Sequence, residues 1–211
     1  MMRYTVGLDL GMGAEPTALA VLERRRVEPT DKLDQRQPPY ALRHLERFAP
    51  GTGFPVIFDE LGTLLGTPPL PGAWLLVDYT GVGRAVLRLL VGALTGRVTC
   101  QYSQILVTAG HLVGSPPTGG FAIAKPELIG TLMVLLQTRR LQIAKDLPHA
   151  ALLVRELENY RPKVTLPKAD ELAWRDGAHD DLLLAVALAA WGGERALPAE
   201  GRQERMTVWR S

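Results

Sequence analysis

Four aspartates occupy places where a carboxylate is costly unless something balances its charge. Asp180 and Asp181 lie near the start of the segment 177–191, "GAHDDLLLAVALAAW", which is apolar on nearly every side after them. A helix of that kind is buried, so two adjacent carboxylates at its N-terminus repel each other away from bulk solvent. Acidic residues are also common in the first turn of ordinary helices, where they cap free N–H groups. The pair therefore indicates either a helix cap or part of an acidic site.

The other two aspartates favour the acidic site. Asp9 lies inside the apolar strand predicted at 3–10, where an ionisable group is costly without a partner. Asp78 ends the apolar strand predicted at 73–78, and ligands of open α/β sheets bind at the carboxyl ends of strands. The alternative for Asp78 is a purely local role as the acceptor of a turn. With the pair at 180–181, these residues predict that three separated segments converge on one acidic pocket.

A pocket of carboxylates indicates a particular class of metal ion. A cluster without cysteine and with few histidines suits a hard cation such as Mg²⁺ or Mn²⁺. Two such ions, about 3.5–4 Å apart, activate a water molecule and stabilise the leaving oxygen in phosphodiester cleavage. The predicted catalytic residues, which are also the predicted ligands of two ions, are Asp9, Asp78, Asp180 and Asp181. Their neighbour His179 is either a cap or surface residue or an auxiliary group beside the metals.

The elements that position these residues are predicted from hydrophobic periodicity and turn residues. Strands are predicted at 3–10, 17–27, 40–48, 73–78, 97–106 and 141–144, and helices at 55–65, 84–94, 125–140, 148–160 and 177–191. Residues 107–124, with "GSPPTGG" at their centre, are predicted as an irregular excursion. Strands first, and then strands alternating with helices, predict an α/β fold with a mixed central sheet covered by helices on both faces.

Length and composition place the chain among ordinary soluble globular proteins, with 211 residues, 46% hydrophobic and 22% charged. No apolar run reaches the roughly 18 residues that cross a bilayer, and the start has no signal-peptide layout. We therefore expect a cytoplasmic protein without a membrane partner. The single Cys100 excludes an internal disulfide and a cysteine-based zinc site. Residues 1–192 are expected to form one domain, followed by a flexible polar tail at 193–211.

Charge is unevenly distributed along the chain. The formal net charge is +2, yet residues 79–145 contain seven basic residues against Glu127 alone, a net of +6. This excess suits a polyanionic partner. The alternative is that these residues form solvated helix faces whose acidic counterparts come from other parts of the fold.

In their order and spacing, these segments resemble the nuclease domain of the large terminase subunit of tailed bacteriophages, in the RNase H-like superfamily. The resemblance is carried by "GLDLGMG" with "TALAVL", "LLVDYTGVGRAVLRLL", "KPELIGTLMVLLQTRRLQIAKD", "LLVRELENY" and "GAHDDLLLAVALAAW", and it covers about residues 3–192. It implies an RNase H-like nuclease domain over that length. It also implies a metal-dependent endonuclease that cuts concatemeric viral DNA at the start and end of packaging.

The resemblance also implies roles for individual residues. Asp9 and Asp78 would be metal ligands from the first and fourth strands, Asp181 the third ligand, and Asp180 a contact to the second ion. Double-stranded DNA would lie near residues 107–124 and 161–175. The basic residues expected to bind it are Arg84, Lys125, Arg139, Arg140, Arg161, Lys163 and Lys168. Implied partners in the host cytoplasm are a packaging ATPase, a small terminase subunit and the portal.

One departure and three alternatives stand beside this interpretation. Large terminases normally begin with a packaging ATPase, and no G-x-x-x-x-G-K-[ST] motif occurs here, so motor activity is not predicted. "GLDLGMGAEPTALAVLE" and "LLVDYTGVG" also resemble phosphate loops of actin-like ATPases and sugar kinases, whose second lobe has no room in 211 residues. A Holliday junction resolvase would use the same acidic site. A non-catalytic DNA-binding prophage remnant would keep the acids without turnover.

Overall fold

A seven-stranded mixed sheet is the centre of the computed structural model, which describes residues 3–25, 37–109, 114–116, 119–160 and 180–195. The strands are β1 (Tyr4–Asp9), β2 (Ala18–Arg24), β3 (Tyr40–Arg47), β4 (Trp74–Asp78), β5 (Gln101–Thr108), β6 (Phe121–Ala124) and β7 (Leu141–Ile143). The helices are α1 (Phe54–Gly66), α2 (Gly83–Leu94), α3 (Lys125–Gln137), α4 (Ala150–Asn159) and α5 (Asp181–Arg195). The strand order is β6-β5-β4-β1-β2-β3-β7.

The directions of the strands bring several carboxyl ends to one edge of the sheet. β1, β2 and β3 form an antiparallel meander, and β4 pairs in parallel with the other side of β1. β5 and β6 continue in parallel beyond β4, and β7 is parallel to β3. Every strand in this sheet except β2 therefore runs in the same direction. The last residues of β1, β3 and β4, which are Asp9, Arg47 and Asp78, consequently lie at the same edge.

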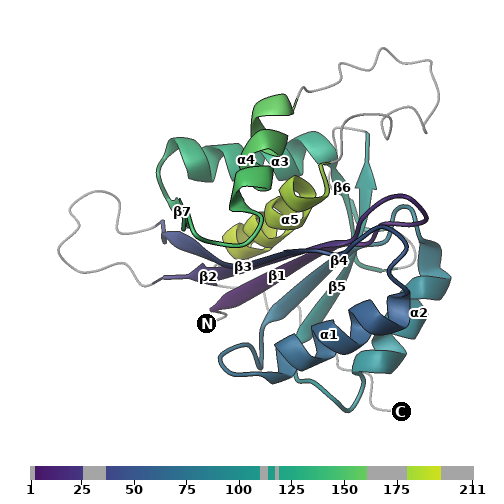
Figure 1. Cartoon of the computed structure of the whole chain (residues 1–211). Helices are drawn as coiled ribbons and strands as arrows, with labels where there is room; N and C mark the ends of the chain where they lie inside the picture. The colour runs from purple at the N-terminus through teal and green to yellow at the C-terminus, as the bar shows by residue number, and fades with distance from the viewer. Residues whose placement is uncertain (1–2, 26–36, 110–113, 117–118, 161–179, 196–211) are drawn as a thin grey trace.

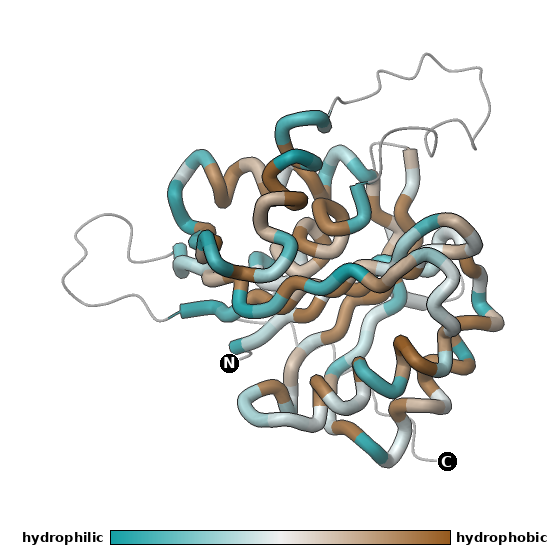
Figure 2. Tube along the Cα trace, in the orientation of Figure 1, coloured by the Kyte–Doolittle hydropathy of each residue, from teal (hydrophilic) through white to brown (hydrophobic). Residues whose placement is uncertain are grey.

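Helices cover both faces of the sheet, and each face has its own core (Figure 1). α3, α4 and α5 lie on one face, and α1 and α2 lie on the other. Strand residues alternate between the two cores, as the pleat requires. On β1, Val6 and Leu8 pack in the core between the sheet and helices α1 and α2, while the intervening Gly7 faces α5. Figure 2 shows that the central strands are largely hydrophobic along their length.

Helix α5 lies directly against β1, and this contact sets the position of its N-terminus. The Thr5 hydroxyl donates a hydrogen bond of 2.8 Å to the backbone carbonyl of Ala189. A Cβ atom on Gly7 would lie only 2.0 Å from the carbonyl oxygen of Ala185. Because Thr5 meets Ala189 and Gly7 meets Ala185, α5 runs antiparallel to β1. Its first residue, Asp181, therefore lies over the end of β1, near Asp9.

The structure confirms the predicted α/β class, with a mixed sheet and helices on both faces. One segment was predicted wrongly: residues 107–124 contain the end of β5 and the strand β6, which pairs in parallel with β5. The strand predicted to start at 97 starts at Gln101. Helix α5 continues to Arg195, three residues beyond the predicted domain end at 192. No helix in the described ranges is long and apolar enough to cross a membrane.

The close packing of α5 on β1 predicts that Gly7→Ala destabilises the fold by at least about 2 kcal/mol, because backbone atoms on both sides must separate to admit the methyl group. Gly92→Ala is the matched control, because Gly92 is exposed on α2 and no atom lies within 4 Å of the added Cβ. It should stabilise by up to about 1 kcal/mol through helix propensity. Urea denaturation measures both. Equal stability of Gly7→Ala and wild type would contradict this packing.

Candidate active site

Two of the predicted site residues are direct neighbours in the sheet. Asp9 and Asp78 are the last residues of β1 and β4, and the parallel pairing of these strands places them in register. Asp9 is also in register with Ala18 on β2, and Ala18 with Arg47 on β3. Because cross-strand partners point to the same face, Asp78, Asp9 and Arg47 form a polar row on the face covered by α5.

Helix α5 adds the other two carboxylates to this row. Asp181 is its first residue, and Asp180 immediately precedes it. The pKa of Asp9 is raised well above its usual value, first by burial and then by the negative charges of Asp78, Asp181 and Asp180. Lys125 has the opposite effect on this pKa. All four predicted acidic residues are therefore close enough to interact electrostatically, as the sequence predicted.

Two cations hold the aspartates of α5. The guanidinium of Arg47 contacts Asp181 Oδ2 through Nη2 at 2.9 Å and through Nε at 3.3 Å. The ammonium of Lys125, the first residue of α3, lies 2.6 Å from Asp180 Oδ2. Lys125 was predicted to bind DNA and lies in the acidic site. Arg47 was not predicted at all, and both side chains are largely buried.

Thr80 orients Asp78. Asp78 Oδ1 accepts hydrogen bonds from the backbone N–H of Thr80, at 2.9 Å, and from its hydroxyl. The hydroxyl oxygen of Thr80 in turn accepts the N–H of Val107 at 2.8 Å, which ties the end of β4 to β5. Asp78 is therefore both the acceptor of a turn and a member of the acidic row, so the two interpretations of this residue are compatible.

A fifth carboxylate, Glu156 on α4, also lies at this site and was missed by the sequence interpretation. It is 6% exposed, and its Oε2 accepts the backbone N–H of Leu183 at 2.8 Å. Burial raises the pKa of Glu156 to about 7, and the charges of Asp181 and Asp180 act in the same direction. A signal was present in the sequence: Glu156 continues the buried series of Ala150 and Leu153 at helical spacing.

The remaining predicted DNA-binding residues are dispersed. Arg84 is exposed in the first turn of α2, after the strand that ends in Asp78. Arg139 follows the end of α3, and Lys125 is the first residue of that helix. Because a 13-residue helix is about 20 Å long, Arg139 and Lys125 lie about that far apart. His179, Arg161, Lys163 and Lys168 lie outside the described residues.

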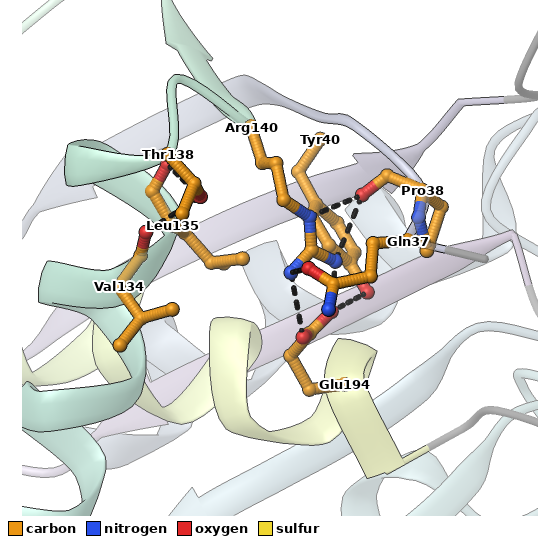
Figure 3. A network of polar contacts seen from close by, with 8 residues as sticks. All are labelled: Gln37, Pro38, Tyr40, Val134, Leu135, Thr138, Arg140 and Glu194. Carbon is orange, nitrogen blue, oxygen red and sulfur yellow. Dashed lines mark hydrogen bonds and ion pairs between the residues drawn. The ribbon is translucent and has the colours of Figure 1, made fainter. Parts of the chain in front are cut away.

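Arg140 has a structural position far from the acidic row. Its guanidinium forms two hydrogen bonds to Glu194 at the end of α5, of 2.6 and 2.9 Å, and two to the carbonyl of Pro38 (Figure 3). The Tyr40 hydroxyl donates to the same Glu194 carboxylate at 2.7 Å. With 9% exposure and these partners, Arg140 joins α5 to the start of β3, at the end of that strand opposite Arg47. We therefore leave it out of the proposed DNA-binding set.

The donor chemistry of the acidic row fits a hard divalent cation. Its candidate ligands are all carboxylates, and the pKa of Asp9 is raised first by burial and then by neighbouring negative charges that a cation would neutralise. As the side chains stand, no group of three His, Cys, Asp or Glu residues within the described part of the chain is arranged to hold an ion. Arg47 and Lys125 instead pair with Asp181 and Asp180. Both contacts of Arg47 are to Asp181 Oδ2, and Lys125 contacts Asp180 Oδ2, so a bound cation would compete with these two ion pairs for the carboxylates.

Comparison with solved structures identifies the fold. The large terminase nuclease from thermophilic phage G20c matches with a TM-score of 0.57 and 22% identity, over 89% of this chain and 80% of that one. A mutant of the large terminase subunit from bacteriophage Sf6, solved with calcium, matches with a TM-score of 0.55 and 14% identity, over 89% of this chain and 88% of that one. The HK97 bacteriophage large terminase matches with a TM-score of 0.54 and 12% identity, over 91% of this chain and 40% of that one.

The chain thus has the fold of the large terminase nuclease structures that it matches, as its sequence resemblance implied. No protein-family model matches the sequence, and no curated protein matches it. The likeness to solved structures therefore defines the fold, and the activity rests on the site.

The charge balance of the site predicts that Asp9→Asn stabilises the metal-free protein by about 1 kcal/mol, or about 2–4 °C in Tm. Asn carries no charge, so it avoids both the cost of burying a charge and the carboxylate repulsion that raise the pKa of Asp9. Because the folded protein holds Asp9 and Glu156 protonated more readily than the unfolded chain does, wild-type stability in EDTA should fall as pH rises from about 4 to 7. Asp9→Asn should weaken this dependence.

Thermal unfolding in EDTA at several pH values measures this effect. Asp59→Asn is the matched control, because the side chain of Asp59 is exposed on α1 and pairs with the exposed Arg97. Its free energy of unfolding should change by less than about 0.5 kcal/mol. A metal-free Asp9→Asn protein that is less stable than wild type at pH 7 would contradict the charge repulsion inferred at this site.

Proposed function

We propose that this protein is an endonuclease that hydrolyses phosphodiester bonds of double-stranded DNA with Mg²⁺ or Mn²⁺ as cofactor. The observation that carries the proposal is the register of Asp9 and Asp78 on adjacent parallel strands, beneath Asp181 at the start of α5. The proposal is supported by the oxygen-only donor set and by the fold shared with terminase nucleases.

Each acidic residue has a proposed role in holding two ions. Asp9, Asp78 and Asp181 are the proposed ligands, and Asp180 assists at the second ion. Bound ions of this class supply an activated water and charge neutralisation at the phosphate. Thr80 keeps one Asp78 oxygen fixed, so that Asp78 meets the ion in one orientation. His179, which lies outside the described residues, remains a candidate auxiliary group.

The two buried cations support the same chemistry. Arg47 and Lys125 partly neutralise Asp181 and Asp180 while no metal is bound. If a bound ion took over the charge of Asp180, the Lys125 ammonium would be available to a phosphate oxygen of the DNA backbone. Arg84, Arg139 and the basic residues at 161, 163 and 168 are the proposed outer phosphate contacts, which would make binding weaken as salt rises.

The proposed biological role is cleavage of concatemeric viral DNA during genome packaging, in the cytoplasm of a bacterial host. The support is the fold, which the chain shares with large terminase proteins of three phages. Because the sequence contains no Walker A motif, a packaging ATPase would act from a separate chain or segment. The small terminase subunit and the portal are the other proposed partners.

Cleavage of supercoiled plasmid tests the enzymatic proposal. Wild-type protein should nick and linearise the plasmid in Mn²⁺ or Mg²⁺ and leave it intact in EDTA. Asp9→Asn and Asp78→Asn should each reduce the rate more than about 100-fold, because each removes a proposed metal ligand. Asp59→Asn, an exposed aspartate on α1, should cleave at the wild-type rate.

Two results would count against the proposal. Cleavage that persists in Asp9→Asn would place the chemistry elsewhere or in a contaminant. Wild-type protein that binds the plasmid but leaves it intact in both metals would instead indicate a non-catalytic DNA-binding protein. A four-way junction assayed beside linear duplex distinguishes a resolvase from a terminase-like nuclease.

A further inference from the structure

The first turn of α5 is capped by a residue of another helix. The backbone N–H of Leu184 donates to the carbonyl of Asp180 at 2.9 Å, which makes Asp180 the N-cap residue of α5. Leu183 is then the third residue of the helix, and its N–H needs a partner from outside the helix backbone. In most helices the side chain of the N-cap residue accepts this hydrogen bond. Here the acceptor is Glu156 Oε2 on α4, at 2.8 Å.

This replacement has a consequence for the aspartate pair. Because Glu156 takes the Leu183 N–H, Asp180 can direct Oδ2 to Lys125, at 2.6 Å, instead of using it as the cap. The same hydrogen bond ties the first turn of α5 to α4. Asp181, which contacts Arg47 at 2.9 Å, lies within that turn. Glu156 therefore fixes the backbone that carries both carboxylates.

The burial of Glu156 indicates that this role has an energetic cost. Only 6% of the residue is exposed, and among the described residues its Oε1 has no hydrogen-bond partner. A buried carboxyl oxygen without a partner is unfavourable, and an apolar side chain would continue the buried series of Ala150 and Leu153 on α4. The feature that an apolar side chain could not supply is the acceptor for the Leu183 N–H.

We propose that Glu156 is a positioning residue of the active site: its hydrogen bond to the Leu183 N–H sets the start of α5, and thereby places Asp180 and Asp181 for the metal ions. This proposal rests on the proposed metal-dependent function. Glu156 acts through the backbone of α5 and does not itself hold an ion. An amide oxygen should therefore replace its carboxylate.

Three variants test the proposal, with Mn²⁺ affinity by titration calorimetry as the main readout. Glu156→Ala removes the acceptor and should weaken Mn²⁺ binding at least about 10-fold, the usual effect of losing a group that orients metal ligands. Glu156→Gln keeps an acceptor oxygen for the Leu183 N–H, so its Mn²⁺ affinity should stay within about 3-fold of wild type, a smaller change than removal of the acceptor causes. Glu158→Ala, an exposed glutamate on the same helix, should match wild type.

Amide hydrogen exchange of the metal-free proteins gives a readout that does not depend on activity. The N–H groups of Leu183 and Leu184 should exchange faster in Glu156→Ala, while the central strands β1 and β4 keep their protection. A general loss of protection would mean that Glu156 serves the fold alone, and would overturn the proposal.

The other outcomes also decide. Wild-type affinity in Glu156→Ala would overturn the positioning role. A folded Glu156→Gln protein whose Mn²⁺ affinity is as low as that of Glu156→Ala would show that the negative charge is needed, as for a metal ligand, and would overturn the proposal. If Glu156→Ala does not fold, the Mn²⁺ affinity of Glu156→Gln alone decides by the same criterion. A wild-type protein that binds Mn²⁺ but never cuts DNA would end the nuclease proposal and leave the positioning role intact. If the wild-type protein binds no Mn²⁺, the nuclease proposal and the positioning proposal both fail. The hydrogen-exchange data then show only whether Glu156 fixes the start of α5.

Discussion

The contact between α5 and β1 determines the geometry of the whole site. Gly7 allows the helix backbone to approach the sheet more closely than any side chain would permit, and the Thr5 hydroxyl bonds to the helix at Ala189. Once these two points fix the helix on the strand, its first residue must lie over the carboxyl end of β1. The pairing of β1 with β4 then brings Asp78 beside Asp9, so one packing contact and one strand register assemble three separated segments.

This assembly concentrates negative charge where water is largely excluded, and several features of the molecule balance it. Arg47 shares the cross-sheet row of Asp9 and binds Asp181, and Lys125 reaches Asp180 from the start of α3. Burial and, after it, the charges of Asp78, Asp181 and Asp180 still raise the pKa of Asp9 in the presence of these cations. Sites that bind a charged ligand commonly retain such unfavourable energy, which the ligand then relieves.

The sequence was sufficient to predict the layers, the mixed sheet and the convergence of the four aspartates. Those signals are local, because apolar runs, turns and acids at the ends of strands can each be read within a few residues. The strand β6 was missed because four residues after a Gly- and Pro-rich stretch become a strand only through pairing with β5. Arg140 was assigned to DNA because Glu194, its partner 54 positions away, is not apparent from neighbouring residues.

Glu156 and Arg47 show the same limit at the site itself. Both have ordinary positions in the sequence, one on an amphipathic helix and one at the end of a strand rich in charge. Their roles arise from contacts with α5, whose placement depends on Gly7. The binding of metal by the aspartates remains a prediction, since the structure shows how they are assembled and with which cations they pair.

Diffraction from crystals soaked in Mn²⁺, with anomalous differences to locate the ions, tests the central claim most directly. The account predicts Mn²⁺ bound by Asp9, Asp78 and Asp181. Saturating Mn²⁺ that leaves these carboxylates without an ion would contradict it.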